Sequence, residues 1–406
     1  MNEERKWKTV IKKILPYAGV GLGSAVLAVV VTLLIVFHNR SKLYELENII
    51  DQYYIDDYSK TAIEDAAATA MVDALGNRWS YYIPASEYQA HVDRQENSYV
   101  GIGITIVGRE DGLGFEIIKV EPGSGAEMAG VLPGDVLTKV EGQSVVDLGT
   151  DGTASLICGD AGTKVNITVL RSPDGSIDTN EQPDNIAEHT FSVERKTIQT
   201  TVATGTMLEG NIGLITIANF NSRCASETIA AIENLRKQGV TALIFDVRNN
   251  PGGFKDEMVQ ILDYLLPAGD LFRSEDYAGR TETDTSNANH LKMPMAVLLN
   301  GNSYSAAEFF AAALDEYDWA TVVGEASTGK SHFQVTIPLR DGSAVNLSIG
   351  KYYTPKGVSL ADVGGLQPEV LVEVDDETEM AIYAGTLSPQ EDPQIQRAVE
   401  VLKTGN

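Results

Sequence analysis

The sequence of 406 residues is short of cysteine and histidine, and these shortages exclude several classes of site. Its two cysteines, Cys158 and Cys224, lie far apart and share no metal-type spacing. A disulfide framework and a zinc site are therefore not expected, and we predict neither a metal nor a cofactor. With only five histidines in the chain, a histidine beside any single loop carries little weight.

Basic residues are also scarce, except at the start of the chain. The net charge is −26, although residues 1–42 hold seven Lys/Arg against two Asp/Glu. The remaining chain is therefore strongly acidic, which argues against nucleic acid or anionic lipid as a partner of the soluble part. An apolar content of 43% suits a sizeable core, and the length allows two or three domains.

One uncharged apolar run stands near the N-terminus, from Ile14 to Phe37. Its 24 residues are enough to span a bilayer core of about 30 Å. Basic residues gather before the run and thin out after it: Arg5, Lys6, Lys8, Lys12 and Lys13 precede it, and Arg40 and Lys42 follow. The positive-inside rule then predicts a cytoplasmic tail over residues 1–13, a transmembrane anchor over residues 14–37 and an extracytoplasmic remainder.

The apolar run has two other interpretations, a cleaved signal peptide and a buried core helix. It ends Ile35-Val36-Phe37-His38 without a small-x-small site, which disfavours signal cleavage. Its length and its asymmetric flanks disfavour a core helix. We therefore expect a single-pass protein of the cell membrane, with the N-terminus in the cytoplasm.

Residues 41–94 have a helical pattern. Leu43, Leu46 and Ile49 recur at helical spacing, a second stretch is rich in alanine, and Gly76 with Asn77 stops it. This segment is too short for a catalytic domain. We expect it to serve packing or pairing between copies of the chain, which would make the protein a homo-oligomer.

Residues 95–196 are β-rich, with glycine turns between strands. The predicted strands are Val100 to Val107, Gly114 to Val120, Asp135 to Val140, Lys164 to Arg171 and His189 to Arg195. A polar loop over residues 172–188 separates the last two strands. This pattern is typical of a small β domain.

Strands alternate with helices over residues 197–377, which predicts an α/β core with a mainly parallel sheet. The strands are Ile212 to Ile217, Ala242 to Val247, Met295 to Leu299 and Thr321 to Val323. The helices are Ala225 to Gln238, Lys255 to Leu266 and Ser305 to Tyr317. Function gathers at the carboxyl ends of such strands. Residues 378–406 form a C-terminal segment.

Two loops lie at carboxyl ends of predicted strands. Arg248 to Gly253 carries two glycines that let backbone N–H groups point into a site, as an oxyanion hole requires. An ordinary strand–helix turn is the alternative. Asn300 to Glu308 places Ser305 at a helix start, where the positive helix end favours a nucleophile. A serine at that position is also a common N-cap, so this segment alone does not distinguish a nucleophile from a helix cap.

A third loop, Gly324 to Ser331, matches the phosphate-loop pattern GxxxxGK[ST], and Ala242 to Asp246 resembles the strand that supplies a magnesium-binding aspartate. A phosphate loop must open a helix. Here the strand-like Phe333 to Ile337 follows, on the side of the membrane where nucleotide is scarce. An NTPase is therefore disfavoured. His332 is a weaker alternative as a base for Ser305.

Taken in order, these loops resemble the C-terminal processing peptidases, also called tail-specific proteases, over residues 43–375. Ser305 and Lys330 are separated by twenty-five positions, and Lys330 and Gln334 by four, as in that family. The matching segments are Asp246 to Gly253, Ser303 to Glu308, Gly324 to Gln334, Tyr352 to Pro355 and Gly365 to Glu369 in the core, and Tyr99 to Ile104 and Gly123 to Val140 in its PDZ domain.

The resemblance implies a role for each site residue. Ser305 would be the nucleophile, Lys330 the general base and Gln334 the residue that orients the lysine. Backbone N–H groups of Ala306 and Gly252 would form the oxyanion hole, with Gly253 the less favoured choice. A lysine base must be neutral, so it needs a desolvated pocket.

The PDZ resemblance implies peptide binding. The backbone of Gly101, Ile102 and Gly103 would hold the C-terminal carboxylate of a protein substrate.

Three positions depart from the family pattern. Ser331 follows the lysine where glycine is usual, and Tyr304 precedes the nucleophile where alanine is common. Cys158 stands where relatives often have an arginine, which puts any substrate sensing by that arginine in doubt here.

The resemblance therefore predicts a crotonase-like α/β protease core with an inserted PDZ-like domain. The sequence pattern adds an N-terminal helical segment and one transmembrane helix. The expected enzyme is a serine endopeptidase that cleaves extracytoplasmic proteins near their C-termini. A catalytically silent PDZ scaffold that retains the protease fold is the alternative, against which the intact Ser305, Lys330 and Gln334 argue.

Overall fold

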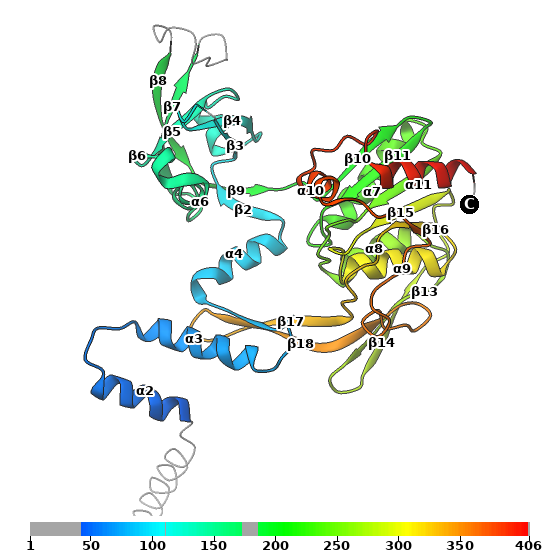
Figure 1. Cartoon of the computed structure of the whole chain (residues 1–406), viewed down its shortest axis with the longest axis horizontal. Coiled ribbons are helices and arrows are strands. Elements are labelled where there is room, and N and C mark those ends of the chain that lie inside the picture. Colours follow the sequence, from blue (N-terminus) through cyan, green and yellow to red (C-terminus); the bar gives the residue numbers. More distant parts are fainter. Residues whose placement is uncertain (1–41, 110, 173–185, 405–406) are drawn as a thin grey trace, which may run out of the picture. The chain divides into compact units, whose positions relative to one another are not determined.

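The computed structural model describes residues 42–109, 111–172 and 186–404, in a chain that divides into units at residues 1–76 and 77–406 (Figure 1). The first unit contains helices α2 (Lys42–Tyr53) and α3 (Lys60–Asp73). Ser59 caps α3 by accepting a hydrogen bond from the Ala62 N–H. Gly76 then adopts φ +67°, so the helical run ends where the sequence predicts.

The predicted anchor over residues 14–37 lies outside the described residues. Within the described ranges, no helix combines the length and the apolar character needed to cross a membrane.

The second unit begins with a short strand, β1 (Tyr81–Ile83), and helix α4 (Ala85–Gln95). The sequence pattern predicts helix throughout this stretch, and the strand is therefore a difference. Its three residues pair with β18 (Ala344–Tyr353), which lies more than 250 residues further along the chain. Backbone hydrogen bonds to a distant strand therefore determine the structure of these residues more than their local helical propensity does.

Strands β2 (Ser98–Gly101) and β9 (Lys196–Gln199) pair as an antiparallel ribbon, and a β-rich module lies between them in the sequence. The module's sheet has the order β3-β4-β5-β7-β8, with β6 paired to β5. These strands are β3 (Ile104–Gly108), β4 (Phe115–Val120), β5 (Val136–Val140), β6 (Gln143–Ser144), β7 (Lys164–Arg171) and β8 (Ala187–Glu194). Helices α5 (Gly125–Ala129) and α6 (Val145–Ile157), which the sequence pattern does not reveal, complete it.

A six-stranded sheet of order β10-β11-β12-β15-β16-β19 forms the other module, and every pairing except β10–β11 is parallel. The mainly parallel sheet predicted from the sequence is thus confirmed. Its strands are β10 (Ala203–Leu208), β11 (Ile212–Ile217), β12 (Ala242–Asp246), β15 (Met295–Leu299), β16 (Ala320–Gly324) and β19 (Val370–Leu371).

Helices cover both faces of this sheet (Figure 1). Side chains such as Phe245 and Val297 share one core with α7 (Cys224–Lys237), α8 (Lys255–Leu265) and α9 (Ala306–Glu316). Alternate side chains such as Ile244 and Leu298 meet α11 (Pro393–Thr404) on the other face. Strands buried on both faces need continuous apolar sequence, which β12 and β15 have. Helix α10 (Asp376–Ala384) precedes α11.

A second, antiparallel sheet joins β1, β13, β14, β17 and β18. Strands β13 (Gly269–Asp276), β14 (Thr281–Ser286) and β17 (His332–Pro338) belong to it. The sequence pattern predicts β17 but not β13 or β14. Strand β14 reads Thr-Glu-Thr-Asp-Thr-Ser, without the apolar alternation by which a half-buried strand is recognised.

Candidate active site

Ser305 lies between β15 and α9, on a sharply bent backbone. Its φ of +59° and ψ of −126° are unusual for a residue with a side chain, and such a conformation costs about 1–3 kcal/mol. The residue is 7% exposed and directly precedes the first turn of the helix. The sequence prediction of a serine at a helix start is thus confirmed.

The buried carboxylate of Glu308 joins the Ser305 loop to the Lys330 loop. Its Oε2 accepts hydrogen bonds from the backbone N–H groups of Ser305 and Lys330, both at 2.8 Å. Its Oε1 accepts from the Gly329 N–H and the Ser327 hydroxyl, both at 2.5 Å. Glu308 is fully buried, so these four donors stabilise its charge. Sequence reasoning gave it no role, although Ser-x-x-Glu is a capping-box signal.

Lys330 carries a largely desolvated amine. Burial lowers its pKa to about 8, although nearby Glu308 acts in the opposite direction; the charge of Arg78 lowers it further. The Nζ atom lies 4.6 Å from the centre of the Trp79 ring and 5.4 Å from that of the Tyr304 ring. About one amine in ten is then neutral at pH 7, and the neutral amine is the form that a lysine base requires.

Gln334 lies on β17, close in sequence to Lys330, but its side-chain amide is used elsewhere. Its Nε2 donates to the carbonyl of His332 at 2.9 Å and to Ser348 Oγ at 3.1 Å. Ser348 Oγ donates in turn to Asn77 Oδ1 at 3.1 Å, an atom that also accepts the Trp79 N–H at 3.0 Å. Gln334 is thus linked to the segment that carries Trp79.

The loop that ends at Gly253 packs against the nucleophile. Gly252 has φ +86°, and a Cβ there would lie 2.7 Å from Ser305 Cβ and 2.9 Å from Ala306 N. Only glycine fits so close an approach. The Gly252 N–H donates to Asn250 Oδ1 at 2.8 Å. The Ala306 N–H, at the first turn of α9, belongs to the group of amides that have no partner within a helix.

The structure also bears on two alternative interpretations. Strand β17 rather than a helix follows Lys330, and the Gly329 and Lys330 amides donate to Glu308. A carboxylate therefore occupies the position that a phosphate group would need, which excludes the phosphate-loop interpretation. His332, the alternative base, is the first residue of β17, and burial lowers its pKa.

Two of the departures from the family pattern have defined surroundings. Ser331 is fully buried, and its Oγ accepts a hydrogen bond from the Ala361 N–H at 2.9 Å. The extra hydroxyl therefore ties the lysine loop to a neighbouring loop. Cys158 is exposed at the C-terminus of α6, and its backbone N–H donates to the carbonyl of Ala154 at 2.9 Å.

The glycine segment of the β-rich module precedes the edge strand β3. Ile102 is fully buried in the module's core, and its carbonyl accepts the Ala126 N–H at 3.0 Å. Gly103 has φ +78°, and a Cβ there would lie 2.3 Å from Ser124 Cβ. The side chain of Ile102 is therefore a core element, while β3 has a free sheet edge within the described strand order.

A buried arginine anchors the start of the glycine loop to the C-terminal helix. Arg248, whose side chain is 4% exposed, pairs with Asp246 at 2.6 Å and with Asp392 at 2.8 Å. It also donates to Gln394 Oε1 at 2.9 Å. Sequence reasoning missed this network because Asp392 lies far along the chain.

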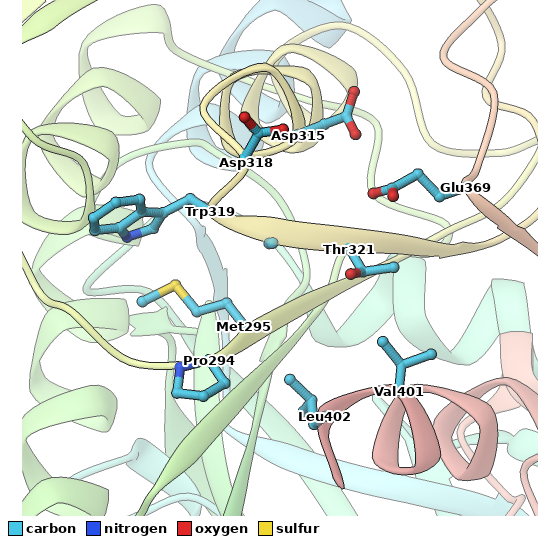
Figure 2. Close-up of a pocket in the computed structure, with 10 residues that line it drawn as sticks. Pro294, Met295, Asp315, Asp318, Trp319, Thr321, Glu369, Val401 and Leu402 are labelled. Atoms are coloured by element: carbon cyan, nitrogen blue, oxygen red, sulfur yellow. The ribbon is translucent and has the colours of Figure 1, made fainter. Parts of the chain in front are cut away.

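A cavity of about 340 Å³ lies at the opposite end of α9 (Figure 2). It is lined by the carboxylates of Asp315, Asp318 and Glu369 and by apolar side chains that include Trp319. Burial and the neighbouring carboxylate of Glu369 raise the pKa of Asp315 to about 6. None of the catalytic candidates lines this cavity.

Comparison with known proteins places the chain in a family. The model of peptidase family S41 matches residues 211–372, and a PDZ-domain model matches residues 116–171. The carboxy-terminal processing protease CtpA of Bacillus subtilis (strain 168) is 30% identical over 341 residues, covering 83% of this chain and 70% of that protein. A Staphylococcus epidermidis protein described as a CtpA-like serine protease is 29% identical, covering 88% and 72%.

A solved structure described as an S41 protease, from Bacteroides fragilis, has the same fold, with a TM-score of 0.51 and 17% identity over 87% of this chain and 93% of that one. The two family models and the two curated relatives identify a serine protease with a PDZ domain. The chain belongs to the carboxy-terminal processing proteases of peptidase family S41.

Proposed function

We propose that Ser305 and Lys330 act as a catalytic dyad. The observation that carries this proposal is the Glu308 carboxylate, which binds the Ser305 and Lys330 amides with the same oxygen. Two loops separated by 25 residues are thereby held together around one buried charge. The lowered pKa of Lys330 further supports its role as a base.

In the proposed reaction, neutral Lys330 accepts the Ser305 hydroxyl proton as Oγ bonds to the scissile carbonyl carbon. The carbon–nitrogen bond then breaks, and Lys330 returns the proton to the leaving amine. Water repeats the sequence and releases the acyl group. Gln334 would orient the lysine amine once its amide leaves Ser348.

The oxyanion hole would consist of the N–H groups of Ala306 and Gly252. The helix N-terminus at Ala306 favours the developing negative charge. Gly252 would have to exchange its hydrogen bond to Asn250 for one to the oxyanion.

Substitution of Lys330 by methionine tests the dyad. We expect Lys330→Met to lower proteolysis of fluorescently labelled casein at least about 10³-fold, with Ser305→Ala and the double variant close to the same level, because the two residues act as one unit. Near-normal proteolysis by Lys330→Met would refute the assignment. Circular dichroism checks that each variant is folded.

We propose further that the PDZ domain reads substrate tails through the backbone around Gly101, Ile102 and Gly103. The free edge of β3 supports this, because a peptide can add there as a strand. Peptides with a free apolar C-terminus should bind with a micromolar-order dissociation constant, and amidation of that end should weaken binding at least about tenfold. Equal binding of both forms would remove tail recognition from the proposal.

Membrane anchoring by residues 14–37 is the third part of the proposal, and the charge asymmetry around this run supports it. Protease added outside intact cells should remove the catalytic part from the membrane. Protection of that part inside sealed, right-side-out vesicles would reverse the orientation.

The expected pairing of copies is supported by the exposed apolar side chains of Leu46, Ile49 and Met71 on α2 and α3. Sedimentation of the solubilised protein as a monomer would oppose this pairing.

A further inference from the structure

Two aromatic rings lie against the amine of Lys330, and neither has a role in the reaction proposed above. The Nζ atom is 4.6 Å from the centre of the Trp79 ring and 5.4 Å from that of Tyr304. The ring centres are 5.4 Å apart, and the ring planes are inclined by 33°. The three points therefore form a nearly equilateral triangle, with the amine against both rings. We name Trp79 and Tyr304 the aromatic clamp.

Trp79 is held in place by the antiparallel sheet. Its N–H donates to Asn77 Oδ1 at 3.0 Å, and its carbonyl accepts from Asn346 Nδ2 at 3.2 Å. The next residue, Ser80, accepts the Ser348 N–H through its hydroxyl at 3.0 Å. The segment before β1 is thus fixed to β18, which positions the indole ring.

Tyr304 is held by a different segment, the loop that precedes α9. Its N–H donates to the carbonyl of Asn250 at 3.1 Å, and the bent backbone of Ser305 follows directly. The two rings therefore belong to separate, hydrogen-bonded segments. Their position against Lys330 is determined by the fold.

An aromatic ring acts on a lysine amine in two opposing ways. By excluding water it favours the neutral amine. By its negative face it attracts the ammonium, an interaction that is strongest in a desolvated site. An aliphatic side chain of similar bulk retains the first effect and loses the second, which allows the two to be separated by substitution.

We propose that Trp79 and Tyr304 are positioning residues that hold Lys330 and stabilise its ammonium form, so that the aromatic clamp sets the pH at which the base becomes active. This inference rests on the proposed role of Lys330 as general base. In the charged state the amine is held against the rings, and loss of the proton frees it for Ser305.

Other charged and titratable groups face Lys330 from the surrounding elements. Glu308 on α9 favours the ammonium, whereas Arg78, before β1, disfavours it. His332 on β17 is coupled electrostatically to Lys330. The Arg78 guanidinium carbon lies 4.2 Å from the centre of the same Trp79 ring. Arg78→Gln should therefore move the lysine pKa upward, opposite to loss of the clamp.

The test measures the rate at which a fluorophosphonate probe labels Ser305 in the full-length protein, as a function of pH. Labelling forms a bond from Ser305 Oγ to phosphorus and releases fluoride, while Lys330 takes the hydroxyl proton. The midpoint of the rate profile then reports the protonation of the base. This readout requires no knowledge of the natural substrate.

In Trp79→Leu and Tyr304→Leu, we expect the midpoint to fall by about half to one pH unit, with labelling about three- to tenfold faster below it. Tyr304→Phe and Trp79→Tyr retain a ring face and should keep the wild-type midpoint to within about 0.2 units. Arg78→Gln should raise the midpoint.

An unchanged or higher midpoint in the leucine variants would overturn the inference, because the rings would then act only by shape or by excluding water. The two leucine substitutions are on separate segments, so if one variant does not fold, the midpoint of the other still tests the inference. Lys330→Met separates the two proposals. If it labels like the wild type, the proposed dyad fails; if it loses labelling while the leucine variants keep the wild-type midpoint, only the clamp fails.

Discussion

The two ends of helix α9 hold acidic side chains in opposite ways. Near its N-terminus, Glu308 is fully buried and accepts four hydrogen bonds. In its last turn, Asp315 lies beside Glu369, and burial together with that carboxylate raises its pKa to about 6. The Glu308 carboxylate is thus stabilised by hydrogen-bond donors, whereas the Asp315 carboxylate lies beside a second carboxylate that disfavours its charge.

The helix itself contributes to this difference. The free amides at a helix N-terminus carry partial positive charge, and the free carbonyls at its C-terminus carry partial negative charge. Glu308 therefore lies where a negative charge is favoured, and Asp315 where it is not. Because Ser305 and the proposed oxyanion hole share the N-terminal end, the favourable field and the donors gather where catalysis would develop negative charge.

The largest expected effect comes from removing the charge at the N-terminal end. Each carboxylate oxygen of Glu308 accepts two hydrogen bonds. In Glu308→Gln, an NH₂ group replaces one of these oxygens, and the two groups that donate to it lose their acceptor. We expect the free energy of unfolding at pH 7 to fall by about 2–4 kcal/mol and fluorophosphonate labelling to drop with it. Urea denaturation measures the change, and a loss below about 0.5 kcal/mol would contradict the role of Glu308 as a bridge.

The second prediction concerns pH at the same end. Since the pKa of Lys330 is lowered to about 8 and the neutral amine is the active form, labelling should rise about tenfold per pH unit below 8 and level off above it. Lys330→Arg should stay inactive at every pH, because the guanidinium remains protonated. A profile with its midpoint near 6.5, abolished by His332→Ala, would assign the base to histidine instead.

The smallest effect is expected at the C-terminal end. A raised carboxyl pKa means that Asp315 contributes stability below its unfolded pKa of about 4, which is lost as the pH rises through 6. Asp315→Asn should therefore match the wild type near pH 4 and be more stable at pH 7, by about 1 kcal/mol after allowance for solvent screening. Denaturation of both proteins at the two pH values measures this, and Asp318→Asn serves as the matched control. A destabilised Asp315→Asn at pH 7 would contradict the comparison of the two helix ends.

The parallel core and the nucleophile segment could be predicted because their signals are local. Continuous apolar strands such as β12 and β15, and a serine at the start of α9, are visible in short windows of sequence. The antiparallel sheet could not be predicted in the same way. Strand β14 has no apolar alternation, and β1 exists only because it pairs with β18.

The residues of the candidate site could be predicted from the sequence, but the contacts between them could not. Spacing and resemblance single out Ser305, Lys330 and Gln334, yet the hydrogen bonds of Gln334 run toward the Trp79 segment. Trp79 lies more than 200 residues before Lys330, and no local pattern connects them. Contacts of this kind depend on how the two sheets bring distant loops together.

The most direct test of the central claim is a comparison of four proteins in one casein assay: wild type, Ser305→Ala, Lys330→Ala and the double variant. If Ser305 and Lys330 form one catalytic unit, each single variant should lose about as much activity as the double variant. If Lys330→Ala, folded by circular dichroism, cleaves casein at close to the wild-type rate, the Ser305/Lys330 dyad is wrong.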